Sequence, residues 1–244
     1  MKGAQMGTTM SWRHELKYPV NAGQAICLQS RIRGLLTPDP HLGGKPFYSV
    51  RSIYFDDCRD RCFHENEDGV SPREKFRIRI YDGNPDIIHL ELKKKERGMT
   101  QKLSCPLTRQ QCEDILYGSG PAREEHAPPV WQKFCLDYQN RLLRPKVIVE
   151  YDRFPWVYGP GNVRVTFDMR IRSSAALSGF LLPQIPSRPI LTAGMHLMEV
   201  KYDEFLPDSV YRTLQTENLQ ISAFSKYYLC RKYNMGGKYG YGFS

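Results

Sequence analysis

The chain has 244 residues, of which 41% are hydrophobic and 25% are charged, so it can form one large folded domain with a well-packed core. Its 15 tyrosines and 11 phenylalanines exclude a disordered basic tail. The formal net charge of +9 favours a polyanionic ligand, without saying which one.

Apolar and polar residues alternate in many segments, a pattern typical of β-strands, and helical stretches fit between them after the N-caps Asn21 and Thr108. In chain order, the sequence predicts strands at Trp12–Val20, Phe47–Asp57, Lys75–Tyr81, Ile87–Lys95, Gln101–Pro106, Lys146–Phe154, Val163–Asp168, Ile171–Ala175 and Leu197–Tyr202. It predicts helices at Ala22–Arg33, Arg109–Leu116, Val130–Leu142, Pro207–Leu214 and Ser225–Lys232, and a surface loop at Ser178–Ala193.

These elements favour an α+β fold that is mainly β: a closed antiparallel β-barrel with helices packed outside. We expect one domain over residues 12–233, with flexible termini at 1–11 and 234–244. No apolar run approaches the ~18 residues that cross a membrane, and the first ten residues lack the apolar stretch of a secretory signal. We therefore expect no membrane segment and a cytoplasmic location.

Seven cysteines lie scattered through the chain without CxxC pairs, as is typical of free thiols in a reducing compartment. Cys58, Cys62 and His64 could form half of a zinc site. No second pair of ligands follows at the spacing of a zinc finger, so we interpret these side chains as ordinary ones.

Ionic residues occupy one face of strand after strand. In Lys75–Tyr81, for example, Lys75, Arg77 and Arg79 alternate with apolar residues. A solvent-facing sheet surface would explain such alternation, but it predicts a rough balance of charge. The five strands with this pattern instead carry Arg13, Lys17, Lys75, Arg77, Arg79, Lys93, Arg164 and Lys201 against Glu15, Glu91, Asp168 and Glu199. Adjacent like charges destabilise a sheet, so the excess of cations indicates a multivalent anion as ligand.

The four carboxylates narrow the choice of anion. They would weaken the binding of sulfate or of a nucleic-acid backbone, which need only cations. A divalent metal such as Mn²⁺ or Mg²⁺ could bridge them to phosphate oxygens. The sequence therefore predicts a polyphosphate or a nucleoside triphosphate, rather than nucleic acid, inside a cationic tunnel.

Ordered motifs over residues 12–233 resemble the VTC (vacuolar transporter chaperone) domain, the polyphosphate-polymerase branch of the CYTH-like triphosphate tunnel metalloenzymes. They are Arg13-x-Glu15-x-Lys17-Tyr18, Arg73-x-Lys75-x-Arg77-x-Arg79-x-Tyr81, Glu91-Leu92-Lys93, Tyr151-x-Arg153, Arg164-x-Thr166-x-Asp168, Glu199-Val200-Lys201 and Phe224-Ser225-Lys226-Tyr227. Arg13 stands where the opening strand of the superfamily has its first Glu, which fits polymerase-type members better than hydrolases.

The resemblance implies transfer of the terminal phosphoryl group of ATP to inorganic polyphosphate, with release of ADP. It implies catalytic phosphate contacts for Arg77, Arg79, Lys93 and Arg153, and substrate-binding roles for Lys17, Lys75, Lys102, Tyr151, Lys201, Ser225 and Lys226. It also implies Glu199 as ligand of Mn²⁺ or Mg²⁺, with Glu15 and Glu91 as competitors. A hydrolase of the same fold and a non-enzymatic polyphosphate-binding module remain alternatives, and the sequence does not specify the oligomeric state.

Overall fold

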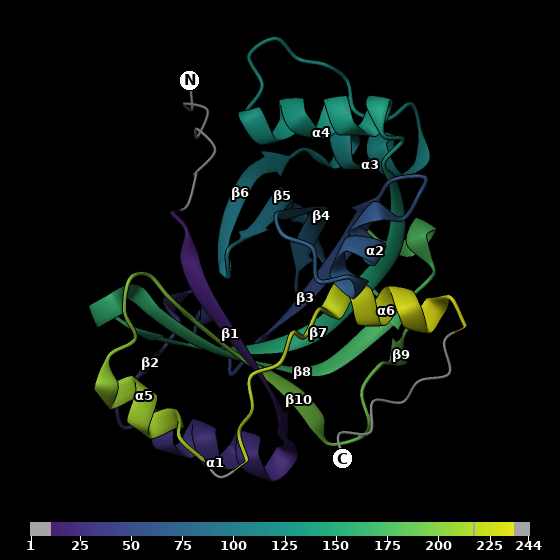
Figure 1. Ribbon diagram of the computed structural model, residues 1–244. Coiled ribbons are helices and arrows are strands. Elements are labelled where there is room, and N and C mark those ends of the chain that lie inside the picture. Colours follow the sequence, from purple (N-terminus) through teal and green to yellow (C-terminus); the bar gives the residue numbers. More distant parts are fainter. Residues whose placement is uncertain (1–10, 217, 237–244) are drawn as a thin grey trace.

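Long antiparallel strands form a closed barrel in the computed structural model, which describes residues 11–216 and 218–236 (Figure 1). They follow one another around the barrel in the order β3-β4-β5-β6-β1-β10-β8-β7, and pairing between β7 and β3 closes the ring. Their bounds are β1 (Arg13–Asn21), β3 (Tyr48–Asp56), β4 (Arg73–Tyr81), β5 (Asn84–Glu96), β6 (Met99–Leu107), β7 (Arg144–Tyr158), β8 (Val163–Ser174) and β10 (Met195–Tyr202). The short strands β2 (Thr37–Pro38) and β9 (Arg188–Pro189) pair with β7 and β8. The predicted mainly-β barrel is confirmed.

One prediction about the strands is wrong. Val163–Asp168 and Ile171–Ala175 are not two strands but the single strand β8. The pairing of β7 with β8 is irregular at the place where the two predicted strands meet, and Arg170 adopts a φ of 50° there. Such a bulge bends a strand without ending it.

The helices match their predicted positions closely, with one addition. The side chains of Asn21 and Thr108 accept backbone N–H groups at the starts of α1 and α3, as predicted. The short helix α2 was not predicted; its N-cap Asp60 has a left-handed backbone conformation and makes no side-chain capping bond. The bounds are α1 (Ala22–Ile32), α2 (Arg61–Glu67), α3 (Arg109–Tyr117), α4 (Pro129–Asn140), α5 (Asp208–Leu214) and α6 (Lys226–Asn234), with single 3₁₀ turns η1 (Pro40–Leu42), η2 (Pro160–Asn162) and η3 (Leu177–Gly179).

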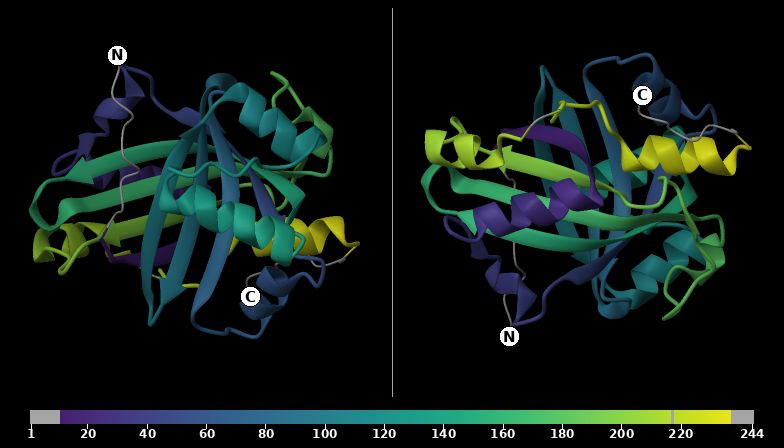
Figure 2. Two further views of the ribbon diagram at one scale, coloured as in Figure 1. Left: turned by 90° about the horizontal axis from the view of Figure 1, so that it is seen from above. Right: turned by 90° about the horizontal axis from the view of Figure 1, so that it is seen from below.

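The apolar faces of the strands point outward and are covered by helices. Figure 1 shows α3 and α4 at one side of the barrel and α1 with α5 at the other, and Figure 2 shows α4 crossing the strands from outside. Phe76 and Leu92 pack with Phe134 of α4, whereas Val200 packs with Leu28 of α1. Because side chains alternate along a strand, this arrangement directs the ionic residues into the barrel.

Two further expectations concern the cysteines and the ends of the chain. All seven cysteines are free thiols, and five of them are buried. Cys58, Cys62 and His64 do not form a zinc site, since residues 11–216 and 218–236 hold no cluster of three His, Cys, Asp or Glu side chains placed to bind a metal. The expected flexible termini fall largely outside the described residues.

None of the described helices has the length and apolar character needed to cross a membrane.

Candidate functional site

The barrel encloses a cavity of about 690 Å³. Lys75, Arg77, Arg79, Lys93 and Lys201 all line it, as their alternation predicts. The cavity is also lined by Glu15, Lys17, Lys102, Tyr151, Arg153, Glu199, Ser225 and Lys226. The structure thus brings nearly all the candidate site residues together, and the remaining one, Glu91, lies in contact with the lining arginines.

The first group of charges is the Glu91 cluster, formed by Glu91, Arg77, Arg79 and Lys102. Glu91 is only 2% exposed, and its Oε2 accepts from Arg77 Nε at 2.7 Å and Nη2 at 2.6 Å. Arg79 Nη1 lies 3.7 Å from the same oxygen, and Lys102 Nζ lies 3.3 Å from Oε1. Register explains the cluster, because Arg77 of β4 is paired directly with Glu91 of β5.

Hydroxyl groups orient the two arginines further. Arg77 Nη1 donates to the Tyr54 hydroxyl at 2.9 Å. Arg79 donates through Nε to Ser52 Oγ at 3.0 Å and through Nη2 to the Tyr151 hydroxyl at 3.2 Å. These contacts hold the planar guanidinium groups in fixed directions at the cavity wall, which suits contacts to phosphate oxygens.

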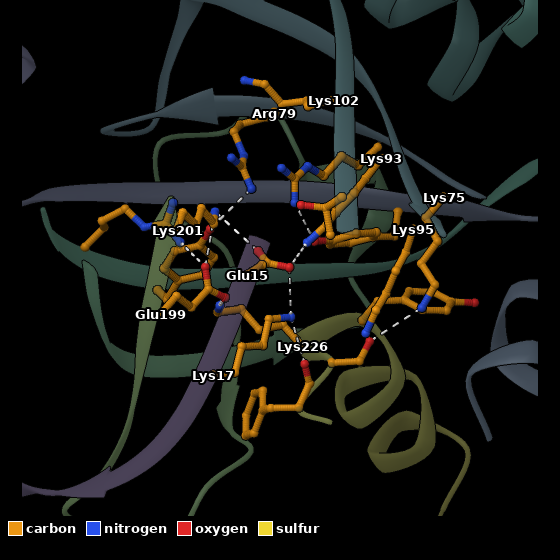
Figure 3. A pocket seen from close by; sticks show the side chains of 18 of the residues that line it. Glu15, Lys17, Lys75, Arg79, Lys93, Lys95, Lys102, Glu199, Lys201 and Lys226 are labelled. Carbon is orange, nitrogen blue, oxygen red and sulfur yellow. Dashed lines mark hydrogen bonds and ion pairs between the residues drawn. The ribbon is translucent and has the colours of Figure 1, made fainter. Parts of the chain in front are cut away.

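The second group is the Glu15–Glu199 cluster, formed by these two carboxylates with Lys17, Lys93, Lys201 and Lys226 (Figure 3). Lys93 Nζ lies 2.5 Å from Glu15 Oε2. Lys226 Nζ lies 2.7 Å from Glu199 Oε1. Lys201 Nζ lies between the carboxylates, 3.4 Å from an oxygen of each.

Arg153 and Asp168 extend this cluster toward β7 and β8. Asp168 is fully buried and accepts both Nε and Nη2 of Arg153 at 2.7 Å. Lys226 Nζ lies 2.6 Å from Asp168 Oδ2, so this one lysine bridges Asp168 and Glu199. The guanidinium group of Arg153 is therefore engaged by a carboxylate through two donors, and the ammonium group of Lys226 has two carboxylate partners.

The charges shift one another's pKa values. Burial alone would raise the pKa of Glu15, but Lys17, Lys93 and Lys201 outweigh it and hold that pKa well below its usual range. Glu199 behaves likewise, its pKa held low by Lys226 and Lys201 against the effect of burial. Both carboxylates are therefore ionised at neutral pH and available to a cation.

Lys75 has no carboxylate in ion-pair contact among the described residues, and the negative charge of Asp56 offsets the effect of its burial only in part. Its Nζ donates to Asn66 Oδ1 at 3.0 Å and lies 4.9 Å from the ring centre of Tyr227. Burial, reinforced by the positive charges of Arg73 and Lys17, lowers the pKa of Lys75 to about 8. A bound anion near this lysine would stabilise its protonated, positively charged form.

The donor set around Lys201 fits a divalent metal. Glu15 and Glu199 direct oxygens toward one ammonium group, so together they already form a small cation site. Thr166, whose position in β8 is paired with Glu199, has a buried hydroxyl without a hydrogen-bond partner among the described residues. Mg²⁺ usually takes one or two carboxylates and completes its shell with phosphates and water, so no third protein carboxylate is needed.

Several residues without a predicted role also line the cavity. Lys95 continues the inward face of Glu91 and Lys93, and Tyr81 continues that of Arg77 and Arg79. The alternation of side chains along a strand places both of them on the inward face, so the sequence contains the information for both. Tyr48, which meets the ring of Tyr81 at a centroid distance of 5.6 Å, gave no such signal.

Taken together, the cavity combines fixed guanidinium groups, several ammonium groups and two ionised carboxylates able to share a cation. This chemistry suits the binding of a phosphate chain together with a divalent metal. The family model of the VTC domain matches residues 12–234 of the chain. No curated protein matches it.

Among solved structures, the chain is similar to a protein from Hippeastrum described as an adenylyl cyclase with a dominant triphosphatase activity. The identity is 14% and the TM-score 0.50, over 91% of this chain and 96% of that one. A protein from Pyrococcus horikoshii OT3 is also similar, at 14% identity and a TM-score of 0.46, over 89% and 97% of the two chains. At such identities the Hippeastrum likeness shows a shared fold.

Proposed function

Since this chain belongs to the VTC domain family, we propose that it is a metal-dependent polyphosphate polymerase that uses ATP as phosphoryl donor. The observation that carries the proposal is the convergence of the Glu91 cluster and the Glu15–Glu199 cluster on one enclosed cavity. Cations alone would serve a binding protein, whereas two carboxylates that share a cation position add a metal site beside the phosphates.

We assign the binding of the triphosphate to the side chains on the cavity wall. Arg77 and Arg79 are held in place by Glu91 and by hydroxyl groups, so they need little rearrangement when phosphate oxygens approach. Lys93 and Lys201 are flexible point charges that can turn from the carboxylates toward the substrate. In this arrangement the arginines stabilise the negative charge on the transferring phosphoryl group. The two lysines reorient toward the same phosphate oxygens.

The transfer step needs no side chain as nucleophile. A terminal oxygen of the polyphosphate forms a bond with the γ-phosphorus of ATP, while the bond from that phosphorus to the β–γ bridging oxygen breaks. ADP leaves with the electron pair, and the polyphosphate gains one unit. The attacking oxygen is already ionised at neutral pH, so no general base is required, and positioning with electrostatic stabilisation supplies the catalysis.

Glu199 and Glu15 would hold the metal in this proposal, with Glu91 committed to its arginines. Bound Mn²⁺ or Mg²⁺ supplies charge neutralisation and polarisation of phosphate oxygens. The release of Lys201 from the two carboxylates would free its ammonium group for the substrate. Free thiols throughout the chain agree with the cytoplasmic location that we expect.

A triphosphate hydrolase is the second candidate. The Hippeastrum protein of the same fold is described by a dominant triphosphatase activity. A hydrolase would use the same phosphate contacts, with water in place of the polyphosphate oxygen. In both reactions the bond to the bridging oxygen is broken, so the acceptor is what distinguishes them.

The test is to incubate the purified chain with ATP and Mn²⁺ and to measure ADP, free phosphate and acid-insoluble phosphate polymer separately. The proposal expects ADP and polymer to appear in equal phosphoryl equivalents. Free phosphate in place of polymer would establish the hydrolase. A protein that binds tripolyphosphate but yields none of these products would be a binding module.

A further inference from the structure

A buried carboxylate outside both charge clusters joins β3, α2 and α6. Asp56, the last residue of β3, is fully buried. Its Oδ1 accepts the backbone N–H groups of Asp57 and Cys62, each at 2.9 Å, and its Oδ2 accepts that of Phe63 at 3.0 Å. Oδ2 also accepts the hydroxyl group of Tyr227, the second residue of α6. These four donors are neutral, so each of their hydrogen bonds matters to a carboxylate that burial removes from water.

Tyr227 connects this carboxylate with the cavity. Its side chain lines the cavity and is only 2% exposed. Its ring centre lies 5.4 Å from that of Tyr54, whose hydroxyl group accepts from Arg77. Burial and the negative charge of Asp56 raise the pKa of Tyr227, so its hydroxyl group stays protonated and donates to Asp56. The ring of Tyr227 therefore belongs to the cavity wall, whereas its hydroxyl group is held by a fully buried carboxylate.

Farther along, α6 is attached to α2, which lies beside it in Figure 1. The hydroxyl group of Tyr228 donates to Glu67 Oε1 at 3.0 Å. Arg231 Nη2 lies 3.1 Å from both carboxylate oxygens of Asp60, the N-cap of α2. These contacts hold the body of the helix and leave the direction of its first two side chains to other partners.

The first residue of α6 is Lys226, which reaches into the cavity. Its Nζ lies 2.6 Å from Asp168 Oδ2 and 2.7 Å from Glu199 Oε1. A lysine side chain is long and flexible, so the position of its backbone limits where its ammonium group can lie. Because Lys226 and Tyr227 are consecutive residues, the hydrogen bond from Tyr227 to Asp56 also restrains the backbone of Lys226.

We propose that Tyr227 is a positioning residue for Lys226: its hydrogen bond to Asp56 fixes the first turn of α6 and thereby directs the ammonium group of Lys226 toward a bound phosphate chain. This inference rests on the proposed function, because it counts Lys226 among the side chains of the cavity wall that bind phosphate. A backbone that is already fixed lowers the conformational entropy lost when the ammonium group engages the ligand. The hydroxyl group of Tyr227 thus acts on the substrate through its neighbour.

The test is Tyr227→Phe, which removes the hydroxyl group and retains the ring that packs against Tyr54. We expect the affinity for tripolyphosphate to fall about fivefold, since Lys226 loses part of its preorganisation for a charge-assisted contact. Tyr228→Phe is the matched control. It removes the neighbouring hydroxyl group from the same helix, but the partner of that group is the exposed Glu67, so the affinity should change less than about twofold. Calorimetric titration measures both variants and the wild type.

A merely structural role of Tyr227 would give a different result. Tyr227→Phe should also lower the Tm, because Asp56 loses a hydrogen-bond partner. At a temperature well below the Tm of each variant, however, nearly all of the protein is folded, and a change in stability alone leaves the affinity unaltered. Thermal melting of every variant sets this temperature. A loss of affinity under these conditions therefore originates in the site.

A double-mutant cycle tests whether the effect passes through Lys226. In Lys226→Gln the ammonium group is absent, so adding Tyr227→Phe should change the affinity for tripolyphosphate less than about twofold. If Tyr227 acted instead through Tyr54 and Arg77, the fivefold loss would persist in the Lys226→Gln protein, and the proposal would be wrong. Should Lys226→Gln not fold, the comparison of Tyr227→Phe with Tyr228→Phe still decides whether the hydroxyl group of Tyr227 positions the site.

The results separate this inference from the proposed function. Equal affinities of Tyr227→Phe and the wild type would overturn the positioning role, whichever products the wild type forms. If Tyr227→Phe binds tripolyphosphate more weakly as expected but the wild type forms only free phosphate from ATP, the positioning role stands and the polymerase proposal fails. If the wild type does not bind tripolyphosphate, both fail.

Discussion

The two charge clusters of the cavity use the same kinds of ions in different ways. In the Glu91 cluster, one almost inaccessible carboxylate accepts two short contacts from the planar guanidinium group of Arg77, and Arg79 lies 3.7 Å away. In the Glu15–Glu199 cluster, two carboxylates share ammonium groups, which have no preferred plane and longer contacts to Lys201. The first arrangement fixes geometry, and the second leaves its members free to exchange partners.

This difference separates a structural carboxylate from functional ones. Glu91 neutralises two buried arginines that could not otherwise lie side by side, and so stabilises the wall. Glu15 and Glu199 neutralise lysines that can move toward a phosphate, and their oxygens then become available to a metal. The comparison therefore predicts that the loss of Glu91 damages the fold, whereas the loss of Glu199 damages the reaction.

The largest effect is expected for Glu91→Gln. Without the charge of Glu91, the guanidinium groups of Arg77 and Arg79 remain buried without a counter-ion, and the free energy of unfolding should fall by about 3–5 kcal/mol. Glu74→Gln is the control, because Glu74 pairs with Lys94 and Lys133 at the partly exposed outer surface and should cost at most about 1 kcal/mol. Urea denaturation measures both. Equal small losses in the two variants would contradict a structural role for Glu91.

For Glu199→Gln we expect a smaller loss of stability but a fall in turnover of about 10²-fold or more, because the metal loses a charged ligand. Tripolyphosphate should still bind in the presence of a chelator, and more tightly than to the wild type, since one anion has left the cavity. Glu204→Gln, at an exposed position outside the cavity, is the control. Release of ADP and titration with tripolyphosphate are the measurements. Undiminished Mn²⁺-dependent turnover would shift the metal assignment to Glu15.

The barrel could be predicted from the sequence because its signal is local. Alternation with a period of two assigns each side chain to one face, so Lys75, Arg77 and Arg79 could be placed together inside without knowledge of the neighbouring strands. Helix α2 lacked a local signal. Its first N–H group, that of Arg61, donates to Asp57, and those of Cys62 and Phe63 donate to Asp56, so no N-cap side chain takes part.

The partners of the site residues could not be predicted, because they depend on register. Glu91 faces Arg77 only because β4 and β5 pair with that particular offset, which includes an irregularity near Tyr81. Asp168 similarly meets Arg153 through the register of β7 and β8, beyond the bulge at Arg170. From its sequence position Glu91 is a competing metal ligand, whereas the structure places it against two arginines. Which of the three carboxylates binds the metal remains a prediction.

Tripolyphosphate should stabilise the folded protein by neutralising both clusters at once. A ligand that binds only the folded state at about 100 times its Kd adds roughly 2.7 kcal/mol, which corresponds to a rise in Tm of about 5–10 °C for a chain of this length. Sodium chloride at equal ionic strength is the control, because it screens the same charges without binding in the cavity. Equal shifts from the two salts would show that the cavity holds no specific phosphate site.

The smallest expected effect is a pH dependence that comes from Lys75, a cavity lysine that belongs to neither cluster. Its pKa of about 8 means that it is protonated at pH 7 and largely neutral at pH 9. Bound phosphate favours the protonated form, so the affinity for tripolyphosphate should lose up to about tenfold between these values through this group. In Lys75→Arg the side chain remains charged over the whole range, and this loss should disappear. The ligand's own ionisation is common to both proteins, so the difference between their titration curves isolates Lys75, and Lys94→Arg controls for substitution on the outer face. Parallel curves for the wild type and Lys75→Arg would place Lys75 outside the phosphate-binding path.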